Sequence, residues 1–173
     1  MQRIFLQMLH TARCSAAGFN NERVNLLPEE LKNQWAMMLR SIQYDEDEKT
    51  ETVLNTEILY YIDTNGERVI SYQESETTGM EGSEMQLRIS PDNMVSIIRS
   101  GTYQTHLFVQ VGTKHFCHYE TPYGDFAVGV FARYVRNRLT DEGGSLRLRY
   151  TVDANSTLLS DNEIWIEIKK YGS

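Results

Sequence analysis

The chain has few of the residues that mark several classes of protein. It carries two cysteines and three prolines among 173 residues, and Cys14 and Cys117 lie far apart in the sequence. One disulfide is possible, but nothing in the sequence supports it, and two free thiols in a reducing, cytoplasmic compartment are the simpler interpretation. No apolar run approaches the roughly 18 residues of a membrane-spanning helix, so we expect no membrane partner.

Motifs of cofactor and catalytic chemistry are also missing. The sequence contains no closely spaced set of metal ligands, no nucleophile elbow and no glycine-rich phosphate loop. We therefore expect no cofactor and no metal, and we assign no catalytic residue.

The charge of the chain is acidic overall but uneven along the sequence. A formal charge of −7 argues against general nucleic-acid binding, which needs clustered lysine and arginine. A basic cluster lies late in the chain. It consists of Arg133, Arg136, Arg138, Arg147 and Arg149. We interpret it as a solvated outer face of a sheet, and the alternative is a local contact with an anion or RNA.

The first 34 residues differ from the rest. The apolar run at residues 4–9 is too short for a signal peptide and is interrupted by Gln7, so a short amphipathic arm is the better interpretation. Pro28 followed by two glutamates predicts a short helix near residues 28–34. An alternative is that translation starts at Met37 or Met38. We expect a partly helical or poorly ordered extension over residues 1–34 and one strand-rich domain over residues 35–173.

From residue 35 onward, apolar and polar residues alternate with the period of a β-strand. The expected strands are residues 36–44, 52–62, 68–74, 84–89, 94–99, 106–111, 114–121, 126–135, 145–152 and 164–168. We expect the strands over 106–111 and 114–121 to form a hairpin across Gly112 and Thr113. Residues 154–162 are predicted to be a polar turn, and Gly129 inside a strand indicates a bend or a close approach.

The short connections between these strands determine the predicted architecture. No connection is long enough for a parallel crossover, so the strands should form an antiparallel meander. Closing the meander removes its exposed edges. We therefore predict an all-β fold, a single antiparallel up-and-down barrel of about eight to ten strands, a size that can hold a small ligand.

Four phrases in the strand-rich part match a known family. They are residues 70–76 (ISYQESE), 95–101 (VSIIRSG), 111–124 (VGTKHFCHYETPYG) and 143–150 (GGSLRLRY). Their order and spacing resemble the YwiB-like bacterial domain family of unknown function over roughly residues 36–170. The resemblance implies a calycin-like, lipocalin-type barrel from a Gram-positive bacterium or a relative. It implies no activity, cofactor or catalytic residue, and it does not reach residues 1–34.

Arg99 is the first candidate for a ligand-binding residue. Strand alternation places it on the same face as Val95 and Ile97, and an arginine buried there needs a carboxylate or an anionic ligand. The acids available for pairing are Glu74 and Glu76. Because Tyr72 shares a face with Glu74, an Arg–Glu–Tyr group can bind a carboxylate or phosphate. The alternative is that Arg99 lies at a strand end, in water or in a structural ion pair.

The strand over residues 114–121 supplies the other candidates. One of its faces carries His115, Cys117, Tyr119 and Thr121, and Tyr123 follows in the next turn. We predict that His115, Tyr119, Thr121 and Tyr123 contribute to a ligand site at the mouth of the barrel. The alternative is that these side chains pack and hydrogen-bond as structural residues.

The histidines do not predict a metal site. His115 and His118 face opposite ways on one strand, and the expected hairpin register pairs His106 with Tyr119 and places His115 opposite Gln110.

Three functions remain open from the sequence. The first is the binding of a small anionic or amphipathic ligand inside the barrel. The second is a structural or protein-interaction barrel whose interior is filled by side chains. The third is an enzyme at the barrel mouth, which would need a titratable pair such as Glu74 with His115.

Overall fold

The computed structural model describes residues 13–14, 34–45, 48–76, 81–101, 104–121, 124–154 and 156–171. For residues 13–14, 118–121 and 124–126 it describes the backbone alone. The strands are β1 (Arg13–Cys14), β2 (Trp35–Asp45), β3 (Glu48–Ile62), β4 (Arg68–Gln73), β5 (Ser83–Ile89), β6 (Val95–Gly101), β7 (Thr105–Val109), β8 (Lys114–Thr121), β9 (Gly124–Thr140), β10 (Gly143–Ala154) and β11 (Thr157–Lys170). None of the described residues belongs to an α-helix, and so the described part contains no helix long and apolar enough to cross a membrane.

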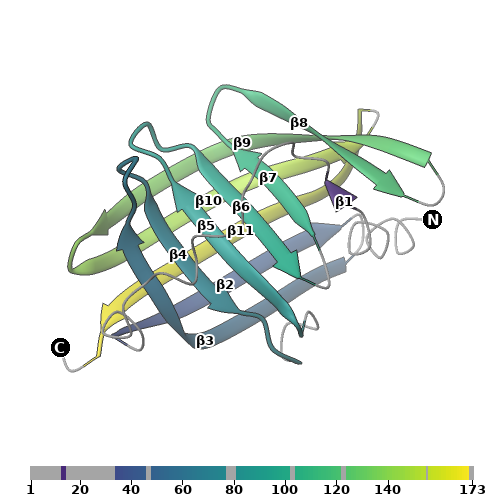
Figure 1. Cartoon of the computed structure of the whole chain (residues 1–173). Helices are drawn as coiled ribbons and strands as arrows, with labels where there is room; N and C mark the ends of the chain where they lie inside the picture. Colours follow the sequence, from purple (N-terminus) through teal and green to yellow (C-terminus); the bar gives the residue numbers. More distant parts are fainter. Residues whose placement is uncertain are drawn as a thin grey trace.

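The ten strands β2–β11 form one antiparallel meander that curls into a nearly closed barrel (Figure 1). Nearly all consecutive strands pair, and β11 pairs with β2 from Asp161↔Tyr44 to Lys170↔Trp35, so the first and last strands of the barrel are neighbours. The all-β prediction is therefore confirmed. Each of the ten predicted strand segments corresponds to one of these strands.

The expected hairpin between β7 and β8 is wrong. Among the described residues, β7 pairs with β6 alone, while β8 pairs with β9 and β1. The only backbone pairing between the two sides of the predicted hairpin is the bridge Gln110↔Thr113, in the connection from β7 to β8. Val111 instead bridges Ala132 of β9. β9, which is 17 residues long, pairs with one edge of β8 along its first half, and the other edge of β8 pairs with β1 and not with β7. The barrel wall is consequently interrupted between β7 and β8.

The predicted helical extension is not supported. Residues 28–33, on which most of the helix was expected, lie outside the described residues, and Gln34 is a bend that leads directly into β2. The two described residues before it, Arg13–Cys14, form a strand instead, with Arg13↔Glu120 and Cys14↔Tyr119. This local structure is extended because the edge of β8, which β7 leaves unpaired, offers backbone hydrogen bonds.

The predicted turn over residues 154–162 is also wrong, since β11 begins at Thr157. Its polar residues from Thr157 onward are strand residues. Ser160 is buried and accepts a hydrogen bond from Nδ2 of Asn162 at 2.9 Å, whereas Asp161 lies on the outer face. Asp161, for example, accepts hydrogen bonds from Nε and Nη2 of Arg149 at 3.0 Å each. Polarity here reflects contact with solvent and with neighbouring strands, and it was misread as a turn.

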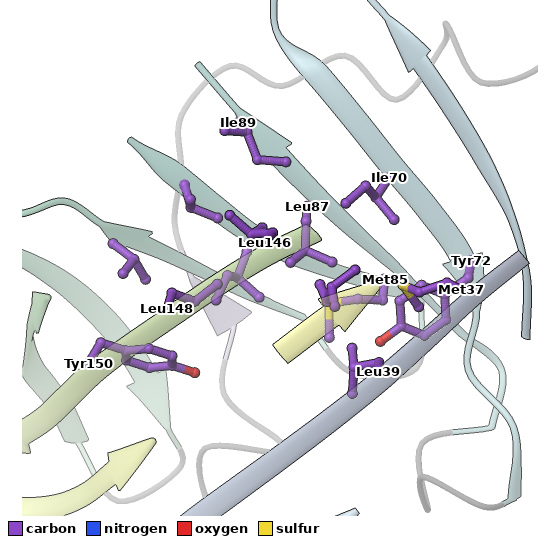
Figure 2. Packing of buried hydrophobic residues seen from close by; sticks show 14 of the residues in the cluster. Met37, Leu39, Ile70, Tyr72, Met85, Leu87, Ile89, Leu146, Leu148 and Tyr150 are labelled. Atoms are coloured by element: carbon purple, nitrogen blue, oxygen red, sulfur yellow. The ribbon is translucent and has the colours of Figure 1, made fainter. Parts of the chain in front are cut away.

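The inner faces of the strands form one continuous apolar core. Fully buried side chains come from β2, β4, β5, β6, β7, β9, β10 and β11; they include Met37, Ile70, Leu87, Ile89, Val95, Val109, Val128, Val130, Leu146, Leu148, Ile166 and Ile168. Figure 2 shows several of them converging from β2, β4, β5 and β10 on the space between the strands. Burial of these rows fixes the strand register, because a slip of one residue would turn each row to solvent.

The two ends of the barrel differ in how the strands are connected. At one end, the turn end, lie the connections β3–β4, β5–β6, β7–β8 and β9–β10, all within the described residues. At the other, the loop end, every connection contains residues outside the described part. The turn end is filled by Trp35 and Tyr60, whose rings pack edge to face with centroids 5.1 Å apart.

Candidate functional site

A group of polar side chains lies inside the barrel near the loop end. Tyr72 and Glu74 follow Ile70 on the inner face at the end of β4, and Arg99 follows Val95 and Ile97 on the inner face of β6. The side chain of Glu74 is only 2% exposed and that of Arg99 19%. The strand alternation that predicted Arg99 on the core face is thus confirmed.

Glu74 and Arg99 form an incomplete ion pair. Nη2 of Arg99 donates a hydrogen bond to Oε1 of Glu74 at 3.3 Å, as expected from the sequence. The other carboxylate oxygen, Oε2, and Nε of Arg99 are both buried and have no hydrogen-bond partner among the described residues. Because a buried polar atom without a partner costs free energy, the described residues alone leave this pair under-satisfied.

Two buried tyrosines complete the group. Burial, together with the carboxylate of Glu74, raises the pKa of Tyr72 despite the opposing charge of Arg99. Burial also raises the pKa of Tyr150 to about 12, again against the effect of Arg99. Both hydroxyls therefore keep their protons at neutral pH and can donate hydrogen bonds. Tyr72 and Tyr150 are labelled in Figure 2, at the edge of the apolar packing.

Tyr150 is the member of the group that our sequence reasoning missed. The alternation over residues 145–152 places it on the same face as Leu146 and Leu148, both of which are fully buried. That signal was present, but only the closed sheet brings β10 across the barrel from β4 and β6.

His115 lies apart from this group. It is the second residue of β8, toward the turn end, where its Nε2 is 2.9 Å from Oε1 of Gln110 and its ring centroid is 5.7 Å from that of Phe108. The predicted register, with His115 opposite Gln110, is wrong because Gln110 bridges Thr113, and His115 meets Gln110 through their side chains alone. Glu74, paired with Arg99 at the loop end, does not meet His115, so these two residues form no acid–base pair.

The predicted pairing of His106 with Tyr119 is also wrong. His106 pairs with Ile98 of β6, and Tyr119 pairs with Phe126 and Cys14. Burial lowers the pKa of His106. Within the described residues, no three His, Cys, Asp or Glu side chains gather closely enough to hold a metal ion.

The predicted residues of the barrel mouth are placed only by their backbone. Tyr119 and Thr121 lie in the last part of β8, next to the loop end, and Thr121 pairs with Gly124. Their side chains, and Tyr123 as a whole, lie outside the described residues. The strand positions of Tyr119 and Thr121 put these two residues at the same end of the barrel as Arg99.

The basic cluster lies on the outer face of β9 and β10. Arg133 and Arg149 both pair with Asp161, at 3.6 and 3.0 Å. Arg136 and Arg147 stand directly opposite each other in the ladder. Each covers an aromatic ring of this face, Tyr134 at 4.9 Å and Trp165 at 3.8 Å. The interpretation as an outer face is confirmed.

A groove of about 600 Å³ lies elsewhere on the outer surface, over β2, β3 and β11. The Tyr171 hydroxyl donates a hydrogen bond to Glu57 Oε1 across it, at 3.3 Å. Its lining combines two glutamates, a lysine and apolar side chains, and this mixture indicates no single class of ligand.

Comparison with known proteins agrees with the resemblance found in the sequence. A family model described as a domain of unknown function (DUF1934) matches residues 37–166. The crystal structure of the ywiB protein from Bacillus subtilis is similar in fold, with a TM-score of 0.66 and 15% sequence identity, over 81% of this chain and 93% of that one. No curated protein matches the chain. At this identity, the structural likeness establishes the fold alone.

Proposed function

We propose that this chain, which belongs to the family of domains of unknown function DUF1934, binds a small polar molecule at the loop end of its barrel. One observation carries the proposal. Oε2 of Glu74 and Nε of Arg99 are buried within one ion pair, and neither has a hydrogen-bond partner among the described residues. A ligand that supplies both missing hydrogen bonds would remove the cost of burying these atoms.

The pair limits the chemistry of the ligand. A simple anion would be attracted by the guanidinium of Arg99 but repelled by the carboxylate of Glu74, which already neutralises it. A group that donates to Oε2 and accepts from Nε satisfies both atoms, as a primary amide or an amino-acid zwitterion does. Tyr72 and Tyr150 add two hydroxyls. In this proposal, a ligand with a neutral or zwitterionic polar group replaces the anionic or amphipathic ligand that the sequence led us to expect.

The site in this proposal is confined to the loop end. The interior toward the turn end is filled by apolar side chains, which include the rings of Trp35 and Tyr60, so a ligand would reach the polar group from the loop end and not through the core. Tyr119, Thr121 and Tyr123 are proposed to line its mouth, from their position along the chain. His115 is not part of it.

The wider classification belongs to the same proposal. The calycin-like, lipocalin-type assignment and a bacterial source follow from the YwiB-like resemblance. A cytoplasmic location is supported by the low cysteine content, two residues in 173, since small secreted domains are commonly rich in disulfides.

A second function is favoured by a different observation. Core side chains such as Met37, Leu87 and Ile166 are no more than 2% exposed, as expected for a barrel whose interior is packed. In that case the barrel is a scaffold, and its outer surface carries the function.

The test is a thermal-shift screen of the purified chain with amino acids, primary amides and small carboxylates, combined with native mass spectrometry of the freshly purified protein. We expect a zwitterion or amide, and not a simple carboxylate, to raise the melting temperature. No bound molecule and no shift with any of these compounds would overturn the proposal in favour of the scaffold.

A double variant separates binding from stability. Glu74→Gln combined with Arg99→Met removes both charges at once, and replacing a buried ion pair by uncharged groups is often neutral for stability. We expect this variant to fold like the wild type and to lose the thermal shift. Tyr134→Phe, on the outer face, is the matched control and should keep it.

A further inference from the structure

Four large, exposed apolar side chains gather on one part of the outer surface. We call them the apolar patch: Val111, Phe116, Phe131 and Leu158, with exposed fractions of 55%, 63%, 40% and 54%. Single exposed apolar residues are normal on a protein surface, but a cluster of them marks an interaction site.

The strand registers bring these residues together. Phe116 of β8 pairs with Gly129 of β9, Gly129 with Asp153 of β10, and Asp153 with Leu158 of β11, so they form one row across four strands. Phe131 lies in the next row, paired with Lys114. Val111 precedes β8, and its bridge to Ala132 places it beside Phe131.

One ion pair crosses the middle of the patch. Nζ of Lys114 lies 2.6 Å from Oδ1 of Asp153 and 5.5 Å from the centroid of the Phe116 ring. Gly129 separates the two charged residues in the sheet, and a Cβ there would collide with the Lys114 side chain and lie 2.9 Å from Oδ1 of Asp153. The glycine expected to mark a close approach thus lets the lysine lie flat across β9.

We propose that the apolar patch is the interface between two copies of this chain, related by a two-fold axis that runs between β9 and β10 and parallel to them. Such an axis exchanges the β8 side of the patch with the β11 side. Phe116 of one copy then faces Leu158 of the other, and Lys114 of each copy faces Asp153 of the other.

The charges of the patch are the reason to choose a second copy as the occupant. The patch holds one cation and one anion side by side among apolar groups, which makes it complementary to itself in an isologous contact. A partner carrying charge of one sign would place a like charge against either Lys114 or Asp153. Phe116 and Phe131 belong to the aromatic residues that are enriched at protein interfaces.

The first experiment is sedimentation equilibrium of the full chain over a wide range of concentration. The double variant Phe116→Ser/Phe131→Ser should weaken the dimer at least tenfold. Val53→Ser is the matched control, because Val53 is 50% exposed but lies on β3, opposite Arg40 in the ladder and away from the patch. We expect the control to dimerise like the wild type.

Two results would overturn the proposal. One is a wild-type chain that stays monomeric at every concentration, and the other is a double variant that dimerises as well as the wild type. Circular dichroism checks that the variants are folded, which we expect because the replaced side chains are exposed.

A charge-reversal experiment tests the pairing itself. The first variant is Lys114→Glu, in which the ion pair is replaced by two acids. The second variant is Asp153→Lys, in which it is replaced by two lysines. In a mixed dimer, the introduced glutamate of the first variant would face the introduced lysine of the second. The unchanged Asp153 of the first would face the unchanged Lys114 of the second, so both contacts become attractive.

The readout of this experiment is native mass spectrometry of the two variants after mixing. We expect mixed dimers above the statistical half, because each variant alone brings like charges together in its own dimer. A statistical distribution would mean that the interface lies elsewhere.

Discussion

The barrel holds two groups of similar composition, one toward each end. Each combines an arginine, a carboxylate and tyrosine, with one tyrosine at the turn end and two at the loop end. At the turn end, Nη1 of Arg68 donates to the Tyr60 hydroxyl at 3.3 Å, and Nη2 lies 2.8 Å from Oδ1 of Asp141. The Tyr60 hydroxyl in turn donates to the carbonyl of Thr140 at 2.8 Å. Since Asp141 is 76% exposed, the carboxylate of this group is also solvated.

The group at the loop end is assembled differently. The carboxylate of Glu74 is almost fully buried, Arg99 reaches it through one long hydrogen bond, and one polar atom on each residue is left without a partner among the described residues. Within the part of the chain that the structure describes, the same residue types therefore give a satisfied structural contact at one end and an unsatisfied one at the other. It is the unsatisfied atoms, and not the composition, that indicate a site.

The largest expected effect is at the buried carboxylate. Glu74→Gln leaves the charge of Arg99 in the interior without its counter-ion, and we expect a loss of about 3 kcal/mol in the free energy of unfolding. Urea denaturation followed by tryptophan fluorescence measures it. A loss below about 1 kcal/mol would show that water reaches Arg99 freely, and the loop-end group would then not differ from the turn-end group.

At high pH, the tyrosines of the two ends should differ in how much each lowers the stability of the fold. In the folded chain, burial raises the pKa of Tyr72 and of Tyr150, the latter to about 12. Above about pH 10 the unfolded chain loses these protons while the folded chain keeps them, so stability falls by up to about 1.4 kcal/mol per pH unit for each tyrosine. For Tyr150 the fall extends to about pH 12, and stability below about pH 10 is unaffected.

Unfolding measured between about pH 9 and 12 checks this dependence. Tyr150→Phe should flatten the fall, and so should Tyr72→Phe. Burial also raises the pKa of Tyr60, but Arg68 opposes the rise both by its charge and by its hydrogen bond to the hydroxyl, whereas Arg99 opposes it at Tyr72 and Tyr150 by charge alone. Tyr60→Phe should therefore flatten the fall less. Equal slopes in all three variants would contradict the distinction between the ends.

Strand alternation predicted most of the fold because it is a local property. It placed β8 with its observed bounds and put Arg99 on the core face with Val95 and Ile97. It failed where pairing is decided by distant segments. Nothing in the residues around Gly112 records that β8 takes β1 and not β7 as its second partner, so the interruption of the wall was not predicted.

The same limit applies to the candidate site. Arg99 and Glu74 were found because an arginine on an apolar face must have a partner, which is a rule about single residues. Tyr150 was missed and His115 was included, since only the closed sheet determines which strand faces which and which end of β8 lies near the site. His115 was predicted to belong to the site because of its chemical type, and not because of its position along the barrel.

A smaller effect is expected from the tyrosine hydroxyls at neutral pH. Tyr60→Phe removes the donor to Thr140 and the acceptor of Arg68, and should cost about 1 kcal/mol. Tyr72→Phe removes a hydroxyl that no hydrogen bond ties to the described residues and should be close to neutral. Thermal denaturation of the two variants measures the difference, and the opposite ranking would mean that Tyr72, and not Tyr60, is held by a structural hydrogen bond.

The smallest effect is expected at the exposed carboxylate of the turn end. Asp141→Asn removes the counter-ion of Arg68, but water and the Tyr60 hydroxyl still solvate the guanidinium, so the loss should be at most about 0.5 kcal/mol. Urea denaturation at low and high salt measures it, and the loss should shrink further in high salt because exposed charges are screened.

The salt dependence of the two carboxylate variants decides whether the two ends differ. The loss in Glu74→Gln should respond little to salt, since that pair is buried. If Asp141→Asn proved as costly and as insensitive to salt as Glu74→Gln, both arginines would depend equally on their carboxylates. The missing hydrogen bonds at the loop end would then no longer indicate a ligand site.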